Sequence, residues 1–136
     1  MTPTAILETA LYADDLDAAE RFYVEILGFS VHGRIAGRHV FFKCGNQMLL
    51  LFNPTVTRVT SSSVTLPVPA HGATGAGHVC FRADAAEIER WKAHLTRKGI
   101  AIEADFVWPS GGRSIYFRDP AGNSVEFAEP RIWGLG

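Results

Sequence analysis

The chain has 136 residues, of which 47% are hydrophobic and 20% charged, and its formal net charge is −1 at pH 7. This composition is typical of a globular protein, and the length suits one domain with a shared core. The balanced charge argues against a general nucleic-acid or membrane-surface binder, and no apolar run approaches the roughly 20 residues that cross a bilayer.

The first half of the chain predicts the element order β-α-β-β-β. An apolar strand is expected over residues 6–12, and Asp14 or Asp15 can then cap a helix because a short acidic side chain accepts bonds from free helix N–H groups. Gly28, which is free to adopt positive φ, is expected to end that helix. The apolar residues at helical spacing are Leu16, Ala19, Phe22, Tyr23, Ile26 and Leu27. Three strands are expected over residues 29–34, 38–43 and 47–52.

The second half predicts the same order. A strand is expected over residues 78–82, and Asp84 with Glu87 has the spacing of a capping box. Ile88, Trp91 and Leu95 predict the buried stripe of a helix, which a glycine at position 99 ends. Further strands are expected over residues 100–106, 114–118 and 124–128.

The two halves are joined by a stretch that is rich in proline, glycine and serine. Residues 54–76 contain three prolines and the run SSS at 61–63, a composition that resists regular structure. We therefore predict a single domain, residues 1–136, made of two modules (about 5–53 and 77–129) joined by the linker 54–76. At the other end of the chain, Ile132 and Trp133 are expected to pack onto the body.

One pattern occurs in both halves and differs at a position that could hold a metal. Residues 37–43 read GRHVFFK and are followed by GNQML at 45–49, while residues 112–118 read GRSIYFR and are followed by DPAGNSVE at 119–126. This repetition indicates a duplicated unit. When the two copies are aligned on their Gly-Asn pairs, Leu49 is the counterpart of Glu126.

Strand alternation selects a candidate metal site. Residues two apart share a face, so Glu8, His78 and Glu126 lie opposite the apolar faces of their strands. If both sheets curve around one cavity, these three side chains could converge, and imidazole nitrogen with carboxylate oxygen suits first-row divalent ions. The alternative is that both glutamates are solvated strand residues and His78 packs in the core.

Other residues are candidates for the chemistry. His39 on one central strand, or Ser114 and Tyr116 on its counterpart, could line the site and exchange protons, whereas the alternative is an aromatic core with a half-exposed histidine. Arg113 could clamp a substrate carboxylate or be a solvated surface residue. His71 lies among glycines that suit a lid or a plain linker.

Two stretches carry a resemblance to a known family. The first contains Asp15-Leu16, Phe22-Tyr23 and Leu27-Gly28-Phe29, and the second reads FRDPAGNSVEF over residues 117–127. Together they are similar to the vicinal oxygen chelate superfamily. This superfamily contains glyoxalase I, bleomycin-resistance proteins, fosfomycin-resistance transferases, methylmalonyl-CoA epimerases and extradiol dioxygenases.

The resemblance implies an α+β fold in which two β-α-β-β-β modules form a cup-shaped, half-barrel mixed sheet around a metal. Carried over to this chain, the ligand positions of the family are Glu8, Leu49, His78 and Glu126. Leu49 cannot bind a metal, so three ligands are implied, which departs from the four-ligand pattern of glyoxalase I. The resemblance also implies a homodimer.

We therefore expect a divalent-metal-dependent enzyme that chelates vicinal oxygens of a small metabolite, by lyase, isomerase or dioxygenase chemistry. The residues leave zinc, nickel, manganese and iron open. In this interpretation Glu8, His78 and Glu126 bind the metal, Glu126, Tyr116 and His39 act in catalysis, and Arg113, Ser114 and His71 bind substrate. The alternative is a metal-free sequestering protein of the bleomycin-resistance type.

The expected environment is the cytoplasm. The N-terminus shows no basic stretch followed by an apolar one, so no signal peptide is expected. Cys44 and Cys80 do not form the kind of framework that crosslinks small secreted domains. We therefore expect free thiols, a small-molecule substrate, and neither nucleic acid nor a membrane as partner.

Overall fold

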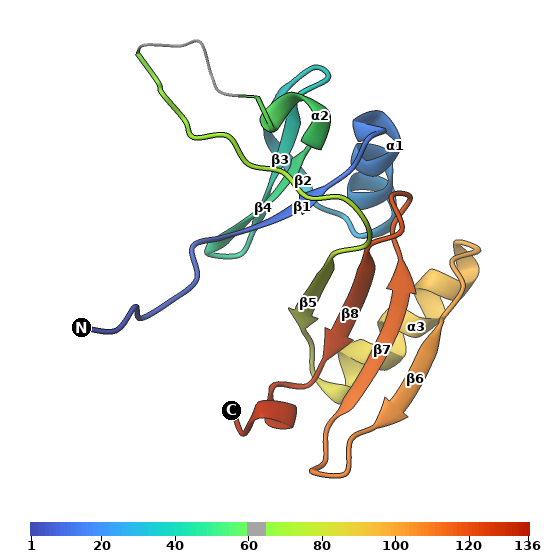
Figure 1. Ribbon diagram of the computed structural model, residues 1–136. Coiled ribbons are helices and arrows are strands. Elements are labelled where there is room, and N and C mark those ends of the chain that lie inside the picture. The colour runs from blue at the N-terminus through green and yellow to red at the C-terminus, as the bar shows by residue number, and fades with distance from the viewer. Residues whose placement is uncertain (60–64) are drawn as a thin grey trace. The chain divides into compact units, whose positions relative to one another are not determined.

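The computed structural model describes residues 1–59 and 65–136, in two compact units, Met1–Gly75 and Ala76–Gly136 (Figure 1). The part of the predicted irregular linker that contains the serine run at 61–63 lies outside the described residues. In chain order the elements are β1 (Glu8–Tyr12), α1 (Leu16–Arg21), η1 (Phe22–Ile26), β2 (Ser30–Ile35), β3 (His39–Cys44), β4 (Gln47–Phe52), α2 (Pro54–Thr57), β5 (His78–Arg82), α3 (Ala85–Arg97), β6 (Ala104–Val107), β7 (Arg113–Arg118), β8 (Ser124–Ala128) and η2 (Pro130–Trp133).

Both units contain a four-stranded mixed sheet, which confirms the predicted α+β class and the β-α-β-β-β order. The strand order is β1-β4-β3-β2 in the first unit and β5-β8-β7-β6 in the second. In each, the first and last strands of the unit pair in parallel and the remaining neighbours pair antiparallel. The first strand of each unit therefore lies beside the last, which brings residues far apart in sequence onto one face.

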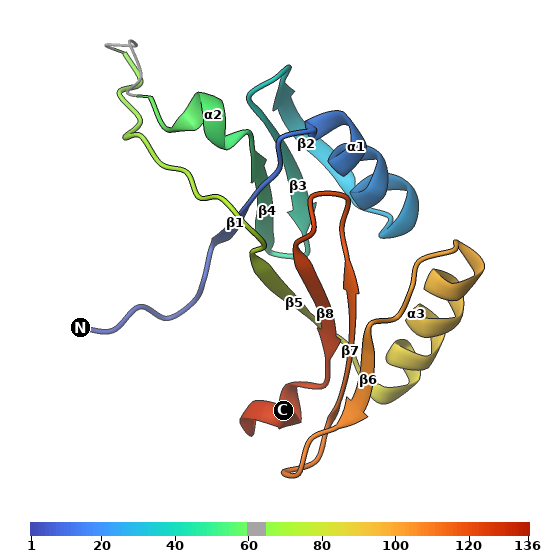
Figure 2. The ribbon, with the colours of Figure 1, turned by 45° about the vertical axis from the view of Figure 1, so that its right-hand side comes forward.

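A helix covers one face of each sheet. In the second unit α3 lies along the sheet (Figure 2), and Trp91 stacks on Phe127 with ring centroids 4.5 Å apart. In the first unit the aromatic side chains of Tyr23 and Phe42 pack together, with ring centroids 5.6 Å apart. Most of the core lies on these helix-covered faces. Val125 and Phe127, for example, are two apart on β8, so both side chains point toward α3, and both are buried. The opposite faces of the sheets, called here the open faces, are not covered by these helices.

The predicted helix caps form. Asp15, rather than Asp14, accepts a bond from the backbone N–H of Ala18 at 2.9 Å. Asp84 and Glu87 make the complete capping box, with reciprocal bonds of 2.7 and 2.8 Å. Each cap satisfies backbone N–H groups that have no partner within the helix, which fixes where the helix begins.

The first helix departs from the prediction of one continuous α-helix. After Arg21 it widens into a π-helix over Phe22–Ile26, in which the N–H of Leu27 bonds to the carbonyl of Phe22 at 3.3 Å. Phe22 and Tyr23 are both buried and meet edge to face with ring centroids 5.3 Å apart. The wider turn accommodates two consecutive large aromatic side chains against the core.

Four expectations were wrong, the first of them the strand expected over residues 100–106, since β6 covers Ala104–Val107. The segment after β4 is not wholly irregular, because Asn53 caps the short helix α2. Strand β1 begins at Glu8, and the two apolar residues before it are exposed. In the tail, Trp133 is exposed rather than packed on the body. Ile132, by contrast, lies against Gly112, whose φ of 87° is readily adopted only by glycine.

Candidate metal and substrate site

The open face of the second sheet carries most of the predicted site. Glu126 lies on the central strand β8, and its register places it between Cys80 on β5 and Tyr116 on β7. Its neighbours Val125 and Phe127 point toward α3 and are buried. The apolar residues on the helix side fix the register, and that register turns Glu126 to the opposite face.

His78 and Glu126 form a close pair on this face. The Nε2 of His78 lies 3.2 Å from Oε2 of Glu126, and the Nδ1 of His78 lies 3.1 Å from the carbonyl oxygen of Ser124. Both ring nitrogens therefore face an acceptor, whereas a neutral imidazole has one N–H. The arrangement is satisfied when the ring is protonated, or when a cation sits at Nε2 while Nδ1–H donates to Ser124. The second arrangement is the usual one for a metal-binding histidine.

The carboxylate of Glu126 is buried, with 5% of the residue exposed. Its Oε1 has no hydrogen-bond partner within residues 1–59 and 65–136. A buried carboxylate with an unpartnered oxygen is costly unless a cation or proton compensates it. The residues present therefore fit a divalent metal. His78 is more accessible, with 51% of its side chain exposed.

Two proton-bearing groups flank Glu126. Burial raises the pKa of Cys80 to about 12, and the nearby Glu126 carboxylate adds to this shift. Burial also raises the pKa of Tyr116 to about 12, again with a contribution from Glu126. Both groups therefore keep their protons at neutral pH. Each can donate a hydrogen bond but neither is an anion there.

Ser114 lies on the same face as Tyr116, as predicted, but it is fully buried. Its Oγ accepts a hydrogen bond from the indole Nε1 of Trp108 at 2.8 Å. Ser114 thus orients Trp108 in this structure. Trp108 was not among the predicted site residues, although it follows the aromatic residue Phe106 by two positions and so shares its face.

Arg113 lies on the other face of the sheet. Its side chain donates to Asp105 at 2.7 and 2.8 Å, and it also pairs with Glu89 of α3. This ion pairing raises the pKa of Arg113 and holds the pKa of Asp105 well below its usual range. Arg113 therefore links α3 to β6 and is separated by the sheet from the Glu126 carboxylate.

The open face of the first sheet has Glu8 at one end. Glu8 is exposed and pairs with Met48, so it shares the open face with Leu50. Leu50 lies between Ala10 and Phe41, as Glu126 lies between Cys80 and Tyr116. The structural counterpart of Glu126 is therefore Leu50, and the assignment to Leu49 was wrong.

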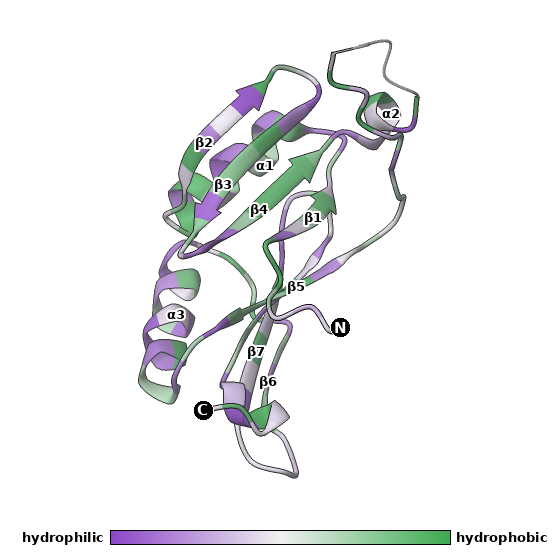
Figure 3. Cartoon of the chain, turned by 90° about the vertical axis from the view of Figure 1, so that its left-hand side faces the viewer, coloured by the Kyte–Doolittle hydropathy of each residue, from purple (hydrophilic) through white to green (hydrophobic). Residues whose placement is uncertain are grey.

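Aromatic and imidazole side chains fill the other end of this face. His39 stacks on Phe41 with ring centroids 4.0 Å apart, and both rings lie near Phe52. Burial, with a smaller effect of Arg38, lowers the pKa of His39. Its Nδ1 is buried and has no hydrogen-bond partner in the described part of the chain. Figure 3 shows β4, on which Phe52 lies, as an almost wholly apolar strand.

His71 also belongs to this group. Its Nδ1 is 2.8 Å from the hydroxyl of Tyr12, and its ring meets Phe52 edge to face at 4.6 Å. The backbone N–H of His71 bonds to the carbonyl of Thr57 at 2.9 Å. The structure thus brings His39 and His71 to one aromatic group, which also contains Tyr12 and Phe52, two residues that were not predicted for the site. Their alternation with Leu11 and Leu51 was the available signal.

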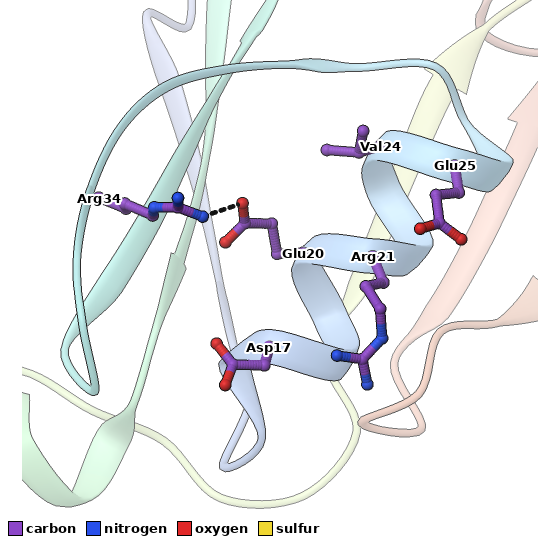
Figure 4. A pocket seen from close by; sticks show the side chains of 6 residues that line it. All are labelled: Asp17, Glu20, Arg21, Val24, Glu25 and Arg34. Atoms are coloured by element: carbon purple, nitrogen blue, oxygen red, sulfur yellow. Dashed lines mark hydrogen bonds and ion pairs between the residues drawn. The ribbon is translucent and has the colours of Figure 1, made fainter.

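A surface hollow lies elsewhere in the first unit, between the first helix and β2 (Figure 4). Its volume is about 270 Å³, and Arg34 bonds to Glu20 across it at 2.5 Å. None of the predicted site residues lines it. The lining residues are Asp17, Glu20, Arg21, Val24, Glu25 and Arg34.

In the described ranges, no three His, Cys, Asp or Glu residues form a group that could hold a metal ion. Of the three predicted ligands, the structure brings His78 and Glu126 together, and Glu8 belongs to the other unit. Cys44 and Cys80 are both free. No helix within the described residues is long and apolar enough to span a membrane.

The chain belongs to the Glyoxalase/Bleomycin resistance protein/Dioxygenase superfamily, which it matches over residues 5–127. The fold is closely similar to the crystal structure of a lactoylglutathione lyase from Agrobacterium tumefaciens. The two chains share 50% sequence identity and a TM-score of 0.95, over 99% of this chain and 100% of the other.

More distant structures share the same architecture. A glyoxalase/bleomycin resistance protein/dioxygenase from Nocardioides has 25% identity and a TM-score of 0.73, over 95% of this chain and 85% of that one. The virulence protein STM3117 from Salmonella typhimurium has 26% identity and a TM-score of 0.69, over 95% and 98% of the chains. No curated protein sequence matches the chain.

Proposed function

We propose that this chain is a divalent-metal-dependent enzyme of the lyase type that acts on a small metabolite with vicinal oxygens. The observation that carries the proposal is the His78–Glu126 pair. Two acceptors face one imidazole ring, and the buried Oε1 of Glu126 has no partner in the described residues. A bound cation would satisfy all of these groups. Family membership and the similarity to a lactoylglutathione lyase support the same class of reaction.

His78 and Glu126 would hold the metal. Glu8 is proposed as a third ligand because the sequence pattern places it at the equivalent strand position of the first unit, and its carboxylate is exposed. Two carboxylates and one imidazole suit a first-row divalent ion, and fewer than four protein ligands leave room for substrate. When bound, such an ion stabilises negative charge that develops on substrate oxygens. Zinc, nickel, manganese and iron all fit this set of ligands.

The other side chains have separate proposed roles. Tyr116, whose pKa is raised to about 12, is a hydrogen-bond donor at neutral pH and would orient a substrate oxygen beside Glu126. Glu126 would also accept a proton through Oε1. Ser114 acts indirectly, by holding Trp108. In the first unit, His39 and His71 would contact the substrate from their aromatic group.

We propose one domain of two modules, about 5–53 and 77–129, that works as a cytoplasmic homodimer in the manner common to the family. The fold and the family support this organisation. Oligomeric state is measured directly by light scattering on the purified protein.

Metal analysis tests the proposed function. Protein purified without chelator should contain about one ion per chain by plasma emission. Any lyase activity that it shows with glutathione and a 2-oxoaldehyde, carrying either a methyl or a phenyl group, should be lost in EDTA. A metal-free protein that also fails to bind Ni²⁺, Mn²⁺, Zn²⁺ and Fe²⁺ would contradict the proposal.

A second candidate is a metal-free protein that sequesters a ligand. Two observations favour it: the described residues hold no group of three metal-ligating side chains, and the open face of the first sheet is largely aromatic. Ligand binding measured with and without EDTA separates the two functions. Binding that is insensitive to the chelator supports sequestration.

A further inference from the structure

A row of aromatic rings begins at His78 and crosses the open face of the second sheet. The ring of Tyr116 stacks on that of His78, with centroids 6.2 Å apart and planes 23° apart. Phe106 then stacks on Tyr116 at 5.8 Å and 10°, and Trp108 meets Phe106 edge to face at 4.9 Å. We call Tyr116, Phe106 and Trp108 the aromatic row.

The strand register places the aromatic row on the face that carries Glu126. Phe106 pairs with Ser114, and residues directly opposite across a strand pair share a face. Ser114 and Tyr116 are two apart on β7, so Phe106, Tyr116 and Glu126 all lie on the open face. Val107, the next residue along β6, points to the other side.

The row combines exposure with fixed geometry. Phe106 is 40% exposed and Trp108 is 36% exposed, while Glu126, which pairs with Tyr116, is buried. Trp108 is held by its bond to Ser114. Tyr116 and Phe106 have nearly parallel planes. Exposed rings that are already oriented bind another flat ring with little loss of conformational freedom.

We propose that the substrate carries an aromatic ring attached next to its vicinal oxygens, and that this ring packs on the aromatic row while the oxygens lie at His78 and Glu126. This inference rests on the proposed function and narrows the class of substrate to aryl-bearing compounds. Phe106 is its specificity-determining residue. A methyl substituent in the same place would leave the exposed rings without a partner.

Matched ligands test the proposal in a binding experiment. Mandelate and lactate both present a hydroxyl beside a carboxylate and differ only in phenyl against methyl. Calorimetry on the Mn²⁺-loaded protein, together with displacement of metal-bound water followed by proton relaxation, measures each affinity. We expect mandelate to bind about tenfold more tightly than lactate. The cyclohexyl analogue of mandelate should bind more weakly than mandelate itself.

Variants assign the preference to the aromatic row. Phe106→Ala should remove most of the mandelate preference and leave lactate affinity unchanged, and Phe106→Leu should do the same while keeping an apolar side chain on β6. Val107→Ala is the matched control, because Val107 is 65% exposed on the opposite face, and it should change neither affinity.

The outcomes distinguish the inference from the function on which it rests. Equal binding of mandelate and lactate, equal binding of mandelate and its cyclohexyl analogue, or an equal loss in Val107→Ala would overturn the aryl assignment alone. If neither acid binds in a metal-dependent way, the proposed function is overturned together with it.

Discussion

At the scale of single residues, the central feature of the site is that the neutral imidazole of His78 has one N–H group but faces two hydrogen-bond acceptors. Its two nitrogens face the Ser124 carbonyl and the Glu126 carboxylate, at 3.1 and 3.2 Å. The carbonyl can only accept, so a metal at Nε2 leaves Nδ1–H to donate to it. In the proposed metal site, the backbone of β8 would thereby select which nitrogen binds the ion, and the same strand would provide the carboxylate.

This geometry predicts the tautomer of His78. In the Zn²⁺-loaded protein, nitrogen-15 NMR should show Nδ1 of His78 protonated and Nε2 bound to the metal, because the Ser124 carbonyl needs a donor. The other histidines of the chain serve as internal references. A spectrum in which Nδ1 of His78 binds the metal would contradict this account.

Asn123 stabilises the turn between β7 and β8. It is buried, its Nδ2 donates to Asp119 at 2.9 Å, and its Oδ1 accepts from the N–H of Gly77 at 2.7 Å. Asn123→Ala should lower the free energy of unfolding by about 2–3 kcal/mol, since it leaves buried polar groups unsatisfied. Asn46, in the corresponding turn of the first unit, is exposed, and Asn46→Ala should change stability by less than about 0.5 kcal/mol in urea titrations. Equal effects of the two substitutions would refute this reading of the turn.

At the scale of elements, local sequence signals predicted where the helices begin more accurately than they predicted the register of the strands. The capping box of α3 was readable as Asp84 and Glu87 because its bonds join residues three apart. The error at Leu49 has a physical cause in the hairpins. In the first hairpin Lys43 pairs with Met48, and the equivalent pair of the second is Arg118 with Ser124, so the second hairpin is one residue longer. Alignment on the Gly-Asn pairs is therefore shifted by one residue, and a one-residue shift exchanges the faces of a strand.

Other features of the structure could not be predicted from neighbouring residues in the sequence. The π-helix depends on burying Phe22 and Tyr23 together against the core. The separation of Arg113 from Glu126 depends on which face of β7 receives α3, where Glu89 and Asp105 bind the guanidinium. The pairing of His71 with Tyr12 joins residues 59 positions apart. Each of these is decided by tertiary packing.

The capping box gives a direct stability prediction. Asp84→Ala should lower the free energy of unfolding by about 1 kcal/mol, because backbone N–H groups at the start of α3 lose their acceptor. Asp14→Ala is the matched control, since Asp15 caps the first helix. Chemical denaturation of both variants checks this. The expectation fails if Asp14→Ala is as destabilising as Asp84→Ala.

Asp105 gives a prediction for pH dependence. Bonds from Arg113 and Lys92 hold its pKa well below the usual value, so its ion pairs stabilise the fold above about pH 4 and are lost as the pH falls further. Asp105→Asn should therefore cost about 1 kcal/mol at neutral pH and have less effect near pH 2, as measured by thermal unfolding across pH. A cost that stays constant between these pH values would show that the ionised carboxylate is not its source.

At the scale of the whole molecule, two units with one topology carry different chemistry. In both units the last strand lies beside the first, and the apolar core lies on the side of the sheet that the helix covers. On the open faces, Leu50 occupies in the first sheet the position that Glu126 occupies in the second, and aromatic rings surround His39. The sequence predicted the element order of both units, and strand alternation turned His78 and Glu126 to the face on which the structure pairs them, but the order of strands within each sheet was not predicted. Nor did the sequence predict the aromatic row, whose members come together only through the pairing of β6 with β7.

The central claim is that His78 and Glu126 bind a divalent metal ion. Calorimetric titration of Ni²⁺ into the metal-free protein, His78→Ala and Glu126→Gln tests it most directly, with Glu103→Gln as the control because Glu103 is an exposed carboxylate of the same unit. The account predicts that the first two substitutions each weaken Ni²⁺ binding by at least about 100-fold and that the control binds like the wild type. Unchanged Ni²⁺ affinity in His78→Ala and Glu126→Gln would contradict it.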